Sequence, residues 1–437
     1  MRSHQARMWT RLASFAIMAV LLPVLSCNEA SKTLRRELKD MDWYRLRALY
    51  VAQGPTVVDF LSEGLKSRST DIRCFAAEAL GKIGDPAGKP ALLAGLKDRK
   101  WRVRRACALA LGDMGDKTAL RELCPAAADK RYEVRVAVAR ALGAIGDKGA
   151  TDALKKLLQD KSWAVRLAAA RSLRLVGDRS ETKALIAWAQ KASEEVRQAA
   201  VFELGEAKEQ SAVPALVALL KNPKWNVAEG SAKSLGAIGS AKATAPVAGL
   251  LKEEDVNVRA AAAEALGKIG TPAAVPPLVA ALDDWDVDVR RQAAKSLGAI
   301  EDRTAAQPLA DLLEREGDAV VCIWTAAALY RMGTENALDY VTRELEHQNP
   351  LVRLNAIEAI AWLRHDAAVP QIVPHLRDGS HYVRLASVRA LSVMPERLAR
   401  EQLTLALNES REDVRREAFQ ILHERYGRKV FDILKAR

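Results

Sequence analysis

The chain has few aromatic residues and few of the residue patterns that enzymes use to bind cofactors or activate substrates. Phe, Trp and Tyr make up 5% of its 437 residues, and it has only six histidines. No HExxH metal motif, GxSxG nucleophile elbow, P-loop or dinucleotide-binding glycine motif occurs in it. These absences exclude the enzyme classes that such motifs define, and we expect no cofactor and no metal site.

Strand-like alternation of apolar and polar residues is also absent. Because aromatic residues are scarce, the 49% of hydrophobic residues are mainly Ala, Leu and Val. Small side chains of this kind suit closely packed helices better than the thick core of a large globular domain. The composition therefore predicts an all-α protein.

The strongest pattern in the sequence is a branched apolar residue followed by arginine, which recurs every 31 residues. It begins at Ile72-Arg73, has Ala228 in place of one arginine, and gains a single inserted residue after Val320. A fixed period of this length is the signature of a repeat protein. The twelve anchor positions are Ile72, Val103, Val134, Val165, Val196, Val227, Val258, Val289, Val320, Val352, Val383 and Val414.

Each anchor opens a stretch in which apolar residues have helical spacing, as Val103, Ala106 and Ala110 show. A glycine-rich turn follows, and a second, shorter apolar stripe then begins near a proline. We expect two helices of about eleven residues in each repeat, and therefore an α-solenoid of about twelve helical hairpins. The prolines are Pro90, Pro214, Pro276 and Pro370.

A single hairpin of this size cannot bury its apolar face, so stacking of neighbouring repeats must stabilise it. The ends of such a stack need atypical segments that cap it. The sequence therefore predicts a processing segment over residues 1–27, an N-terminal capping region over 28–65, the repeat solenoid over 66–416 and a C-terminal capping helix over 417–437.

The repeats resemble those of the HEAT superfamily. Their short A-L-G-x-I-G-D turn, found at residues 79–85 and 141–147, is similar to the variety named after phycobilisome lyases. The resemblance implies the solenoid fold and leaves the function open, because this scaffold serves many tasks. Deoxyhypusine hydroxylases of this type hold iron through repeated His-Glu pairs, whereas this chain has only His423-Glu424. A divergent enzyme or lyase subunit is the alternative to a non-catalytic binding protein.

The first 27 residues form a segment of their own. Three arginines precede an apolar run over residues 12–25, which is too short to span a bilayer comfortably. The run ends in V-L-S-C, which resembles the lipobox of bacterial lipoproteins, where the cysteine, here Cys27, is lipidated. This resemblance implies an exported envelope lipoprotein, on the outer membrane if the organism has two membranes. An ordinary secretory peptide and a retained N-terminal anchor are the alternatives.

Export would place the four remaining cysteines in an oxidising compartment. Their spacings match no zinc motif, and no CxxC occurs. All four lie in helical apolar patterns, so we expect buried free thiols in the place of Ala. A disulfide between Cys107 and Cys124 is the alternative. The four cysteines are Cys74, Cys107, Cys124 and Cys322.

An acidic residue precedes the anchor arginine by six positions in most repeats, as Asp98 precedes Arg104. Where the arginine is replaced by Ala228, position 222 is Asn, which favours pairing of the two positions. By resemblance to HEAT proteins, these residues form a structural ladder of ion pairs that ties one repeat to the next. The predicted ladder comprises Asp98, Arg104, Asp129, Arg135, Asp160, Arg166, Arg197, Arg259, Arg290, Arg353, Arg384 and Arg415.

Aromatic residues with basic neighbours stand two positions before the anchor in four repeats. One position repeated along a solenoid becomes a continuous stripe. Residues 28–226 contain 37 Lys and Arg against 25 Asp and Glu, whereas residues 227–437 contain 27 against 30, so the basic charge is concentrated where these aromatics occur. The candidate binding stripe comprises Lys100, Trp101, Arg102, Arg105, Lys130, Arg131, Tyr132, Lys161, Trp163, Lys224 and Trp225.

Two interpretations of this stripe stay open. Amphipathic aromatics beside cations suit an acidic protein face, an anionic envelope polymer or lipid headgroups. Alternatively, each ring packs over the turn between helices beneath the stems of Lys and Arg. Nucleic acid would also fit by charge, but an exported protein rarely meets it. We expect a protein partner that binds the N-terminal half.

One acidic run, at residues 283–288, opens like a calcium-binding loop. However, Val289 stands where such a loop needs Gly, and Lys295 stands where it needs Glu. We therefore expect a solvated turn whose carboxylates lie at a helix N-terminus.

Overall fold

The computed structural model describes residues 55–222 and 224–426. Within these ranges the chain forms helices and turns and no strand, which confirms the predicted all-α class. Cys27, the processing segment over residues 1–27 and most of the expected N-terminal cap lie outside the described residues. In the part of the chain that the structure describes, no helix is long and apolar enough to cross a membrane.

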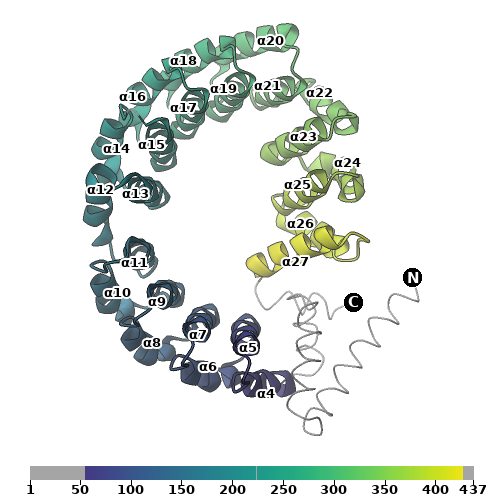
Figure 1. Cartoon of the computed structure of the whole chain (residues 1–437). Coiled ribbons are helices and arrows are strands. Elements are labelled where there is room, and N and C mark those ends of the chain that lie inside the picture. The colour runs from purple at the N-terminus through teal and green to yellow at the C-terminus, as the bar shows by residue number, and fades with distance from the viewer. Residues whose placement is uncertain (1–54, 223, 427–437) are drawn as a thin grey trace. The chain divides into compact units, whose positions relative to one another are not determined.

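The described residues fall into two compact units that divide between Lys183 and Ala184. Each unit is a stack of helical hairpins in two layers, with long helices in one layer and short helices in the other (Figure 1). Helix α12 (Glu181–Lys191) spans the division. This arrangement confirms the predicted α-solenoid.

Twelve long helices lie in the described residues, one for each repeat. The first unit contains α5 (Thr70–Ile83), α7 (Trp101–Met114), α9 (Tyr132–Ile145) and α11 (Trp163–Leu175). The second unit contains α13 (Glu194–Glu206), α15 (Trp225–Ile238), α17 (Val256–Ile269), α19 (Val287–Ile300), α21 (Ala319–Arg331), α23 (Pro350–Leu363), α25 (His381–Ser392) and α27 (Glu412–Tyr426).

The short helices lie between the long ones along the chain. In the first unit they are α4 (Pro55–Gly64), α6 (Lys89–Gly95), α8 (Leu120–Ala126) and α10 (Thr151–Leu157). In the second unit they are α14 (Val213–Leu219), α16 (Thr244–Gly249), α18 (Val275–Ala280), α20 (Ala306–Arg315), α22 (Ala337–Arg343), α24 (Val369–Ile372) and α26 (Glu396–Ala406).

The two helices of a hairpin are unequal, so the expected pair of about eleven residues each is wrong. Long helices such as α7 have 14 residues, whereas short helices such as α6 have seven. The residues that the short helix does not use form the turn between the two helices. Gly84 ends α5 at a φ of 68°, and the Asp85 side chain then accepts a hydrogen bond from the Ala87 N–H to start a 3-10 turn before α6. The predicted prolines are confirmed in the first turn of α6, α14, α18 and α24.

Each long helix begins two residues before its anchor, and this rule corrects the position of the inserted residue. Helix α21 begins at Ala319, so the anchor is Val321 and not Val320. The insertion therefore precedes the anchor, in the segment around α20, instead of following it. Helix α27 begins at Glu412 and runs past residue 417, so the last repeat and the expected C-terminal cap share one helix.

Successive long helices of a unit approach closely at a glycine. A Cβ atom added to Gly81 would lie 2.6 Å from the Cα of Ala110, and one added to Gly236 would lie 2.7 Å from the Cα of Ala265. The sequence supplies a glycine nine residues after the anchor and a small residue seven residues after the next anchor. This pairing lets backbones pack against each other, with a core of Ala, Leu and Val between the layers.

Candidate binding surface

The anchor arginines connect consecutive repeats within each unit. Arg104 donates from Nε to Asp129 of the next repeat at 2.6 Å and from an Nη to the same carboxylate at 2.9 Å. Its other Nη donates to the backbone carbonyl of Asp98 in its own repeat at 2.8 Å. One guanidinium therefore joins two neighbouring loops through a bidentate ion pair and a backbone hydrogen bond.

The carboxylate partner stands about 25 residues after the arginine, in the following repeat, and not six residues before it. Asp98 accordingly pairs with Arg73. Asn222 stands 25 residues after Arg197, so its side chain is not the counterpart of Ala228. The pairs are Arg73–Asp98, Arg104–Asp129 and Arg135–Asp160 in the first unit, and Arg259–Asp284, Arg290–Glu316, Arg353–Asp378 and Arg384–Asp413 in the second.

Three other predicted ladder residues occupy the same helical position. Arg166 lies half-buried in the first turn of α11. Arg197 donates to the backbone carbonyl of Ala192 at 3.1 Å. Arg415 donates to the carbonyl of Glu409 at 2.7 Å. Arg197 and Arg415 thus keep the backbone contact that the other ladder arginines make.

The ion pairs lower the pKa of several ladder carboxylates. The hydrogen bond from Arg135 is the largest influence on Asp160 and, against the effect of burial, holds the pKa of Asp160 below its usual value. Burial is the largest single influence on Asp98 and Asp129 and raises the pKa, but the hydrogen bonds from Arg73 and Arg104, the loop N–H hydrogen bonds and the nearby positive charges together lower the pKa of both. Ionised carboxylates are therefore part of the folded structure.

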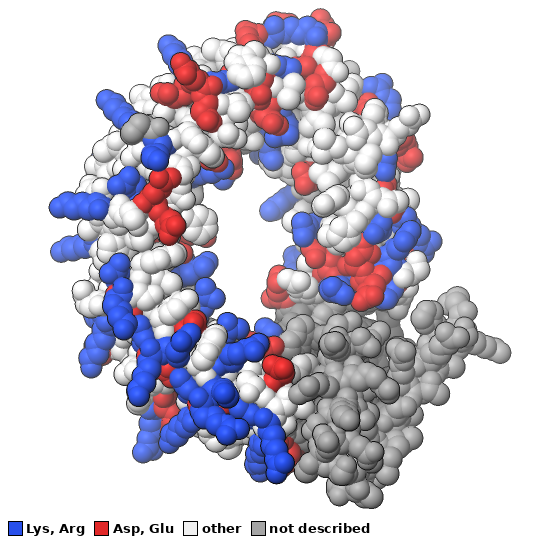
Figure 2. All heavy atoms as spheres, viewed as in Figure 1, with Lys and Arg blue, Asp and Glu red and all other residues white. Residues whose placement is uncertain are grey.

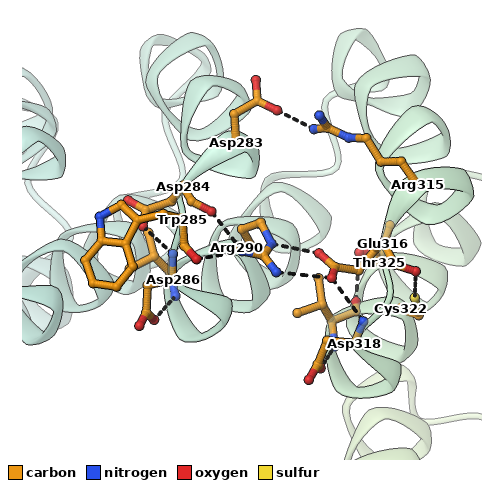
Figure 3. A network of polar contacts seen from close by, with 12 residues as sticks. Asp283, Asp284, Trp285, Asp286, Arg290, Arg315, Glu316, Asp318, Cys322 and Thr325 are labelled. Atoms are coloured by element: carbon orange, nitrogen blue, oxygen red, sulfur yellow. Dashed lines mark hydrogen bonds and ion pairs between the residues drawn. The ribbon is translucent and has the colours of Figure 1, made fainter.

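The ladder is interrupted in the second unit at Cys322, which occupies the arginine position of α21. Its Sγ lies 3.6 Å from the carbonyl oxygen of Glu316, the acceptor position that an arginine uses elsewhere. Figure 3 shows this contact beside the pair between Arg290 and Glu316, whose Nε–Oε2 distance is 2.7 Å. A weak thiol donor thus replaces the backbone contact, but not the ion pair to the next repeat.

A cluster that sequence reasoning missed connects α21 to both neighbouring long helices. Trp324 is buried and donates from Nε1 to Oδ1 of Asn355 at 3.0 Å. Lys295 of α19 places its Nζ 4.0 Å from the centre of the same ring. Trp362 packs edge-on against Trp324 at 5.8 Å. These contacts lie near Cys322, where the ladder lacks an arginine, and they hold α21 against α19 and α23.

The carboxylates of the acidic run at residues 283–288 form ion pairs and hydrogen bonds with other residues of the chain. Asp284 forms an ion pair with Arg259, and Asp283 forms one with Arg315. Asp286 caps α19 by accepting hydrogen bonds from the N–H groups of Asp288 and Val289. Figure 3 shows these side chains directed to different partners rather than toward a common point. Among the described residues, no group of three or more His, Cys, Asp or Glu is arranged to hold a metal ion.

The stripe residues of the first unit lie at the loops where a short helix leads into a long one. Trp101, Tyr132 and Trp163 are the first residues of α7, α9 and α11. Tyr132 is 48% exposed and Trp163 is 41% exposed, whereas Trp101 is half-buried. The ladder arginines join the same loops to one another, so the stripe forms one row within this unit.

Two cations of the stripe in the first unit already interact with other residues of the protein. The Arg131 guanidinium lies 5.1 Å from the centre of the Trp101 ring and pairs with Glu133 at 2.7 Å. Arg102 faces Asp71 at 3.7 Å. The interpretation in which rings are covered by cationic side chains therefore applies to Trp101. Four exposed cations, Lys100, Arg105, Lys130 and Lys161, have no carboxylate within ion-pairing distance among the described residues.

The remaining stripe residues, Lys224 and Trp225, belong to the second unit. Trp225 is the first residue of α15 and is 50% exposed. Lys224 pairs with Glu194 at 3.3 Å, and Asn226 donates to the same carboxylate at 2.6 Å. The acidic neighbour partly neutralises this site, which distinguishes it from the row in the first unit.

A shallow open groove of about 420 Å³ lies along α13, α15 and α17 of the second unit. Gly230 lines it at a helical position where Ala106 and Ala137 stand in other repeats, and half-exposed Phe202 forms its side. Sequence reasoning missed this groove. The available signal was the change from Ala to Gly three residues after the anchor.

The four cysteines are free thiols. Cys107 and Cys322 are buried, but Cys74 and Cys124 are only half-buried, so the expectation that all four are buried is wrong for these two. Cys107 therefore forms no disulfide with Cys124. Its side chain packs over Gly95, where a Cβ atom added to the glycine would lie 2.4 Å from the Cys107 Sγ. Burial raises the pKa of Cys107 well above its usual value.

Comparison with known proteins matches this chain to a model of HEAT repeats over residues 58–135, 120–194, 182–256, 246–330 and 338–423. Yeast importin-beta (Kap95p) is 16% identical, with 93% of this chain and 67% of that chain covered and a TM-score of 0.52, which shows a shared fold. Human deoxyhypusine hydroxylase in complex with glycerol is 25% identical over 56% of this chain and 96% of that chain, with a TM-score of 0.27. None of the curated proteins matches the sequence.

Proposed function

The chain belongs to the HEAT repeat family, and from this premise we propose that it is a non-catalytic scaffold that binds another protein. The observation that carries the proposal is the exposure of large aromatic rings in a chain with few aromatics. Tyr132, Trp163 and Trp225 recur at one position of the repeat and remain in solvent. Tyr and Trp at such positions are typical of the residues that dominate protein interfaces.

We further propose that the protein is an exported envelope lipoprotein. The support is the segment over residues 1–27, with its basic start, short apolar run and lipobox-like end at Cys27. Metabolic labelling with a palmitate analogue tests this proposal. We expect label on the wild-type protein and none on a Cys27→Ser variant, which should also leave the membrane fraction. Equal labelling of the two proteins would contradict lipidation at Cys27.

A photo-crosslinking amino acid at position 163 or 225 tests the scaffold proposal in the organism's own cells. We expect both positions to yield an adduct with the same protein, identified by mass spectrometry. The control position is Lys148, which is exposed but lies in the 3-10 turn after the C-terminal end of α9. Absence of a protein adduct at 163 and 225, or the same adducts at 148, would contradict the proposal.

A second measurement addresses the non-catalytic part of the proposal. The turn at residues 79–85 is similar to that of phycobilisome lyases, and other HEAT-like proteins bind iron. Protein purified from its own cells should contain neither pigment nor iron in stoichiometric amount, by absorption spectroscopy and metal analysis. A stoichiometric pigment or metal would favour an enzyme or lyase subunit.

A further inference from the structure

The loops between short and long helices in the first unit form a row with surplus positive charge. We call the loops at residues 66–69, 97–100, 128–131 and 159–162 the basic row. Arg73, Arg104 and Arg135 each bridge one of these loops to the next, so the four are consecutive neighbours. The described part of this unit, residues 55–183, has 26 Lys and Arg against 16 Asp and Glu.

The carboxylates of the basic row are neutralised inside the protein. Asp98, Asp129 and Asp160 each receive a ladder arginine, and each also accepts a hydrogen bond from a loop N–H, as from Lys100 to Asp98 at 2.7 Å. These acids therefore leave no free negative charge to balance the surrounding lysines. The cations without an ion-pair partner among the described residues are Arg68, Lys97, Arg99, Lys100, Lys130 and Lys161.

The repeat itself does not require these cations. The ladder needs one arginine and one acid in each repeat, and the equivalent loops of the second unit satisfy it with other residues. Three of these second-unit loops, at 252–255, 283–286 and 316–318, contain mainly acidic residues, with a single lysine. Figure 2 shows Lys and Arg gathered over the part of the first unit where α6 to α10 lie. A structural requirement of the fold therefore does not explain the basic row.

We propose that the basic row binds an extended acidic segment of a protein partner that also carries aromatic or aliphatic side chains. This inference rests on the proposed scaffold function and names the partner chemistry. The exposed rings of Tyr132 and Trp163 lie at the ends of two of these loops and supply apolar contacts between the cations. Trp, Tyr and Arg are the residues favoured at protein interfaces, so rings placed between cations suit a protein segment that offers both carboxylates and apolar side chains.

The spacing of the row suits an extended chain. Packed helices lie about 10 Å apart, so four consecutive loops span roughly 30 Å. An extended peptide rises about 3.3 Å per residue, so about nine residues reach from the first loop to the last. In an extended chain every second side chain faces the same side, so acidic and apolar residues that take turns at these positions would meet the cations and the rings of the row.

The experiment uses the full chain and a fluorescent peptide of about ten residues in which Glu and Phe take turns at every second position with Ser between them, and a version with Gln in place of Glu is the control. Fluorescence anisotropy gives the dissociation constant. We expect the Glu peptide to bind more tightly than the Gln peptide, with an affinity that falls as salt is raised. The triple variant Lys100→Glu, Lys130→Glu and Lys161→Glu should lose at least about tenfold in affinity.

A matched variant separates a site from general charge. Arg121, Arg140 and Lys148 are exposed cations of the same unit that lie outside the basic row. Their replacement by Glu changes the net charge equally, and the peptide affinity should then change less than about threefold. If either triple Glu variant unfolds, the row and control positions are compared as triple Ala variants instead. Equal weakening by both triple variants would overturn the proposal.

Other occupants give distinct results. Tighter row-dependent binding of phosphatidylserine vesicles or of an oligonucleotide than of the peptide would overturn the assignment to an acidic protein segment. Salt-sensitive dimerisation abolished by the row variant would assign the row to a second copy of the chain and overturn it as well. An unchanged crosslinked partner in cells that carry the row variant would overturn this inference but leave the scaffold function standing. Absence of any protein adduct would instead remove the scaffold function.

Discussion

Gly112 in α7 and Ala141 in α9 lie in direct backbone contact: a Cβ atom on Gly112 would stand 2.7 Å from the Cα of Ala141. Real Cβ atoms do not approach other carbons so closely, so any side chain at this position would force the two helices apart. The same relationship recurs between other consecutive long helices. It explains how a chain of small residues packs a stable stack.

The first prediction concerns this contact. Gly112→Ala should lower the free energy of unfolding by about 1–3 kcal/mol or more, because the obstructing atoms belong to the backbone and to the first side-chain atom of Ala141. Urea unfolding followed by circular dichroism measures the change. The control is Gly249→Ala, where the backbone is right-handed helical and nothing lies within 4 Å. It should be neutral or stabilise by less than about 1 kcal/mol. Equal effects of the two changes would contradict the close packing.

The second prediction concerns the ladder. The side chains of Arg135 and Asp160 are only 8% and 10% exposed, so Arg135→Ala leaves a largely buried carboxylate without its partner and should cost about 3 kcal/mol. Arg140→Ala, at an exposed site of the same helix, should change stability by less than about 0.5 kcal/mol. The double variant with Asp160→Ala should cost less than the sum of the single changes. Strict additivity would show that the pair has no coupling energy.

The third prediction follows from the lowered pKa of Asp160. Its folded-state pKa lies below the unfolded value of about 3.9, so its contribution to stability is present above that pH and is lost as the pH falls toward the folded-state pKa. Asp160→Asn should therefore flatten the fall in stability between about pH 5 and pH 2. Urea titrations at several pH values measure it. The control, Asp152→Asn at an exposed position of α10, should keep the wild-type profile. A wild-type profile for Asp160→Asn would count against the prediction.

The fourth prediction concerns the thiols. Cys107 is buried and its pKa is raised, so little thiolate is present and an alkylating reagent has no access to it. Native protein treated with iodoacetamide should be labelled at Cys124 before Cys107, as peptide mass spectrometry would show. In urea, both should react at similar rates. Equal labelling in the native state would contradict the buried position of Cys107.

The distinction between sequence and tertiary structure is clearest in the ladder. The arginine period and the acidic period are visible in the sequence, but spacing alone associated Asp98 with Arg104, six residues away. In the folded chain the arginine side chain extends to the loop of the next repeat and does not pair with the carboxylate six residues before it. Its ion-pair partner is therefore the acidic residue about 25 positions later in the sequence. The inserted residue was likewise assigned to the wrong side of its anchor, because only the helix start at Ala319 locates it.

The sequence by itself determined the all-α class, the solenoid and its twelve repeats, because a 31-residue period of apolar residues, glycines and prolines acts locally within each hairpin. It also located the aromatic residues at the starts of the long helices. Tertiary structure alone decided which charges remain free. Arg131 stacks on Trp101, and the ladder arginines neutralise the loop acids, whereas Lys100, Lys130 and Lys161 are exposed and have no ion-pair partner among the described residues. Pairing depends on contacts between residues far apart in sequence, and composition does not record those contacts.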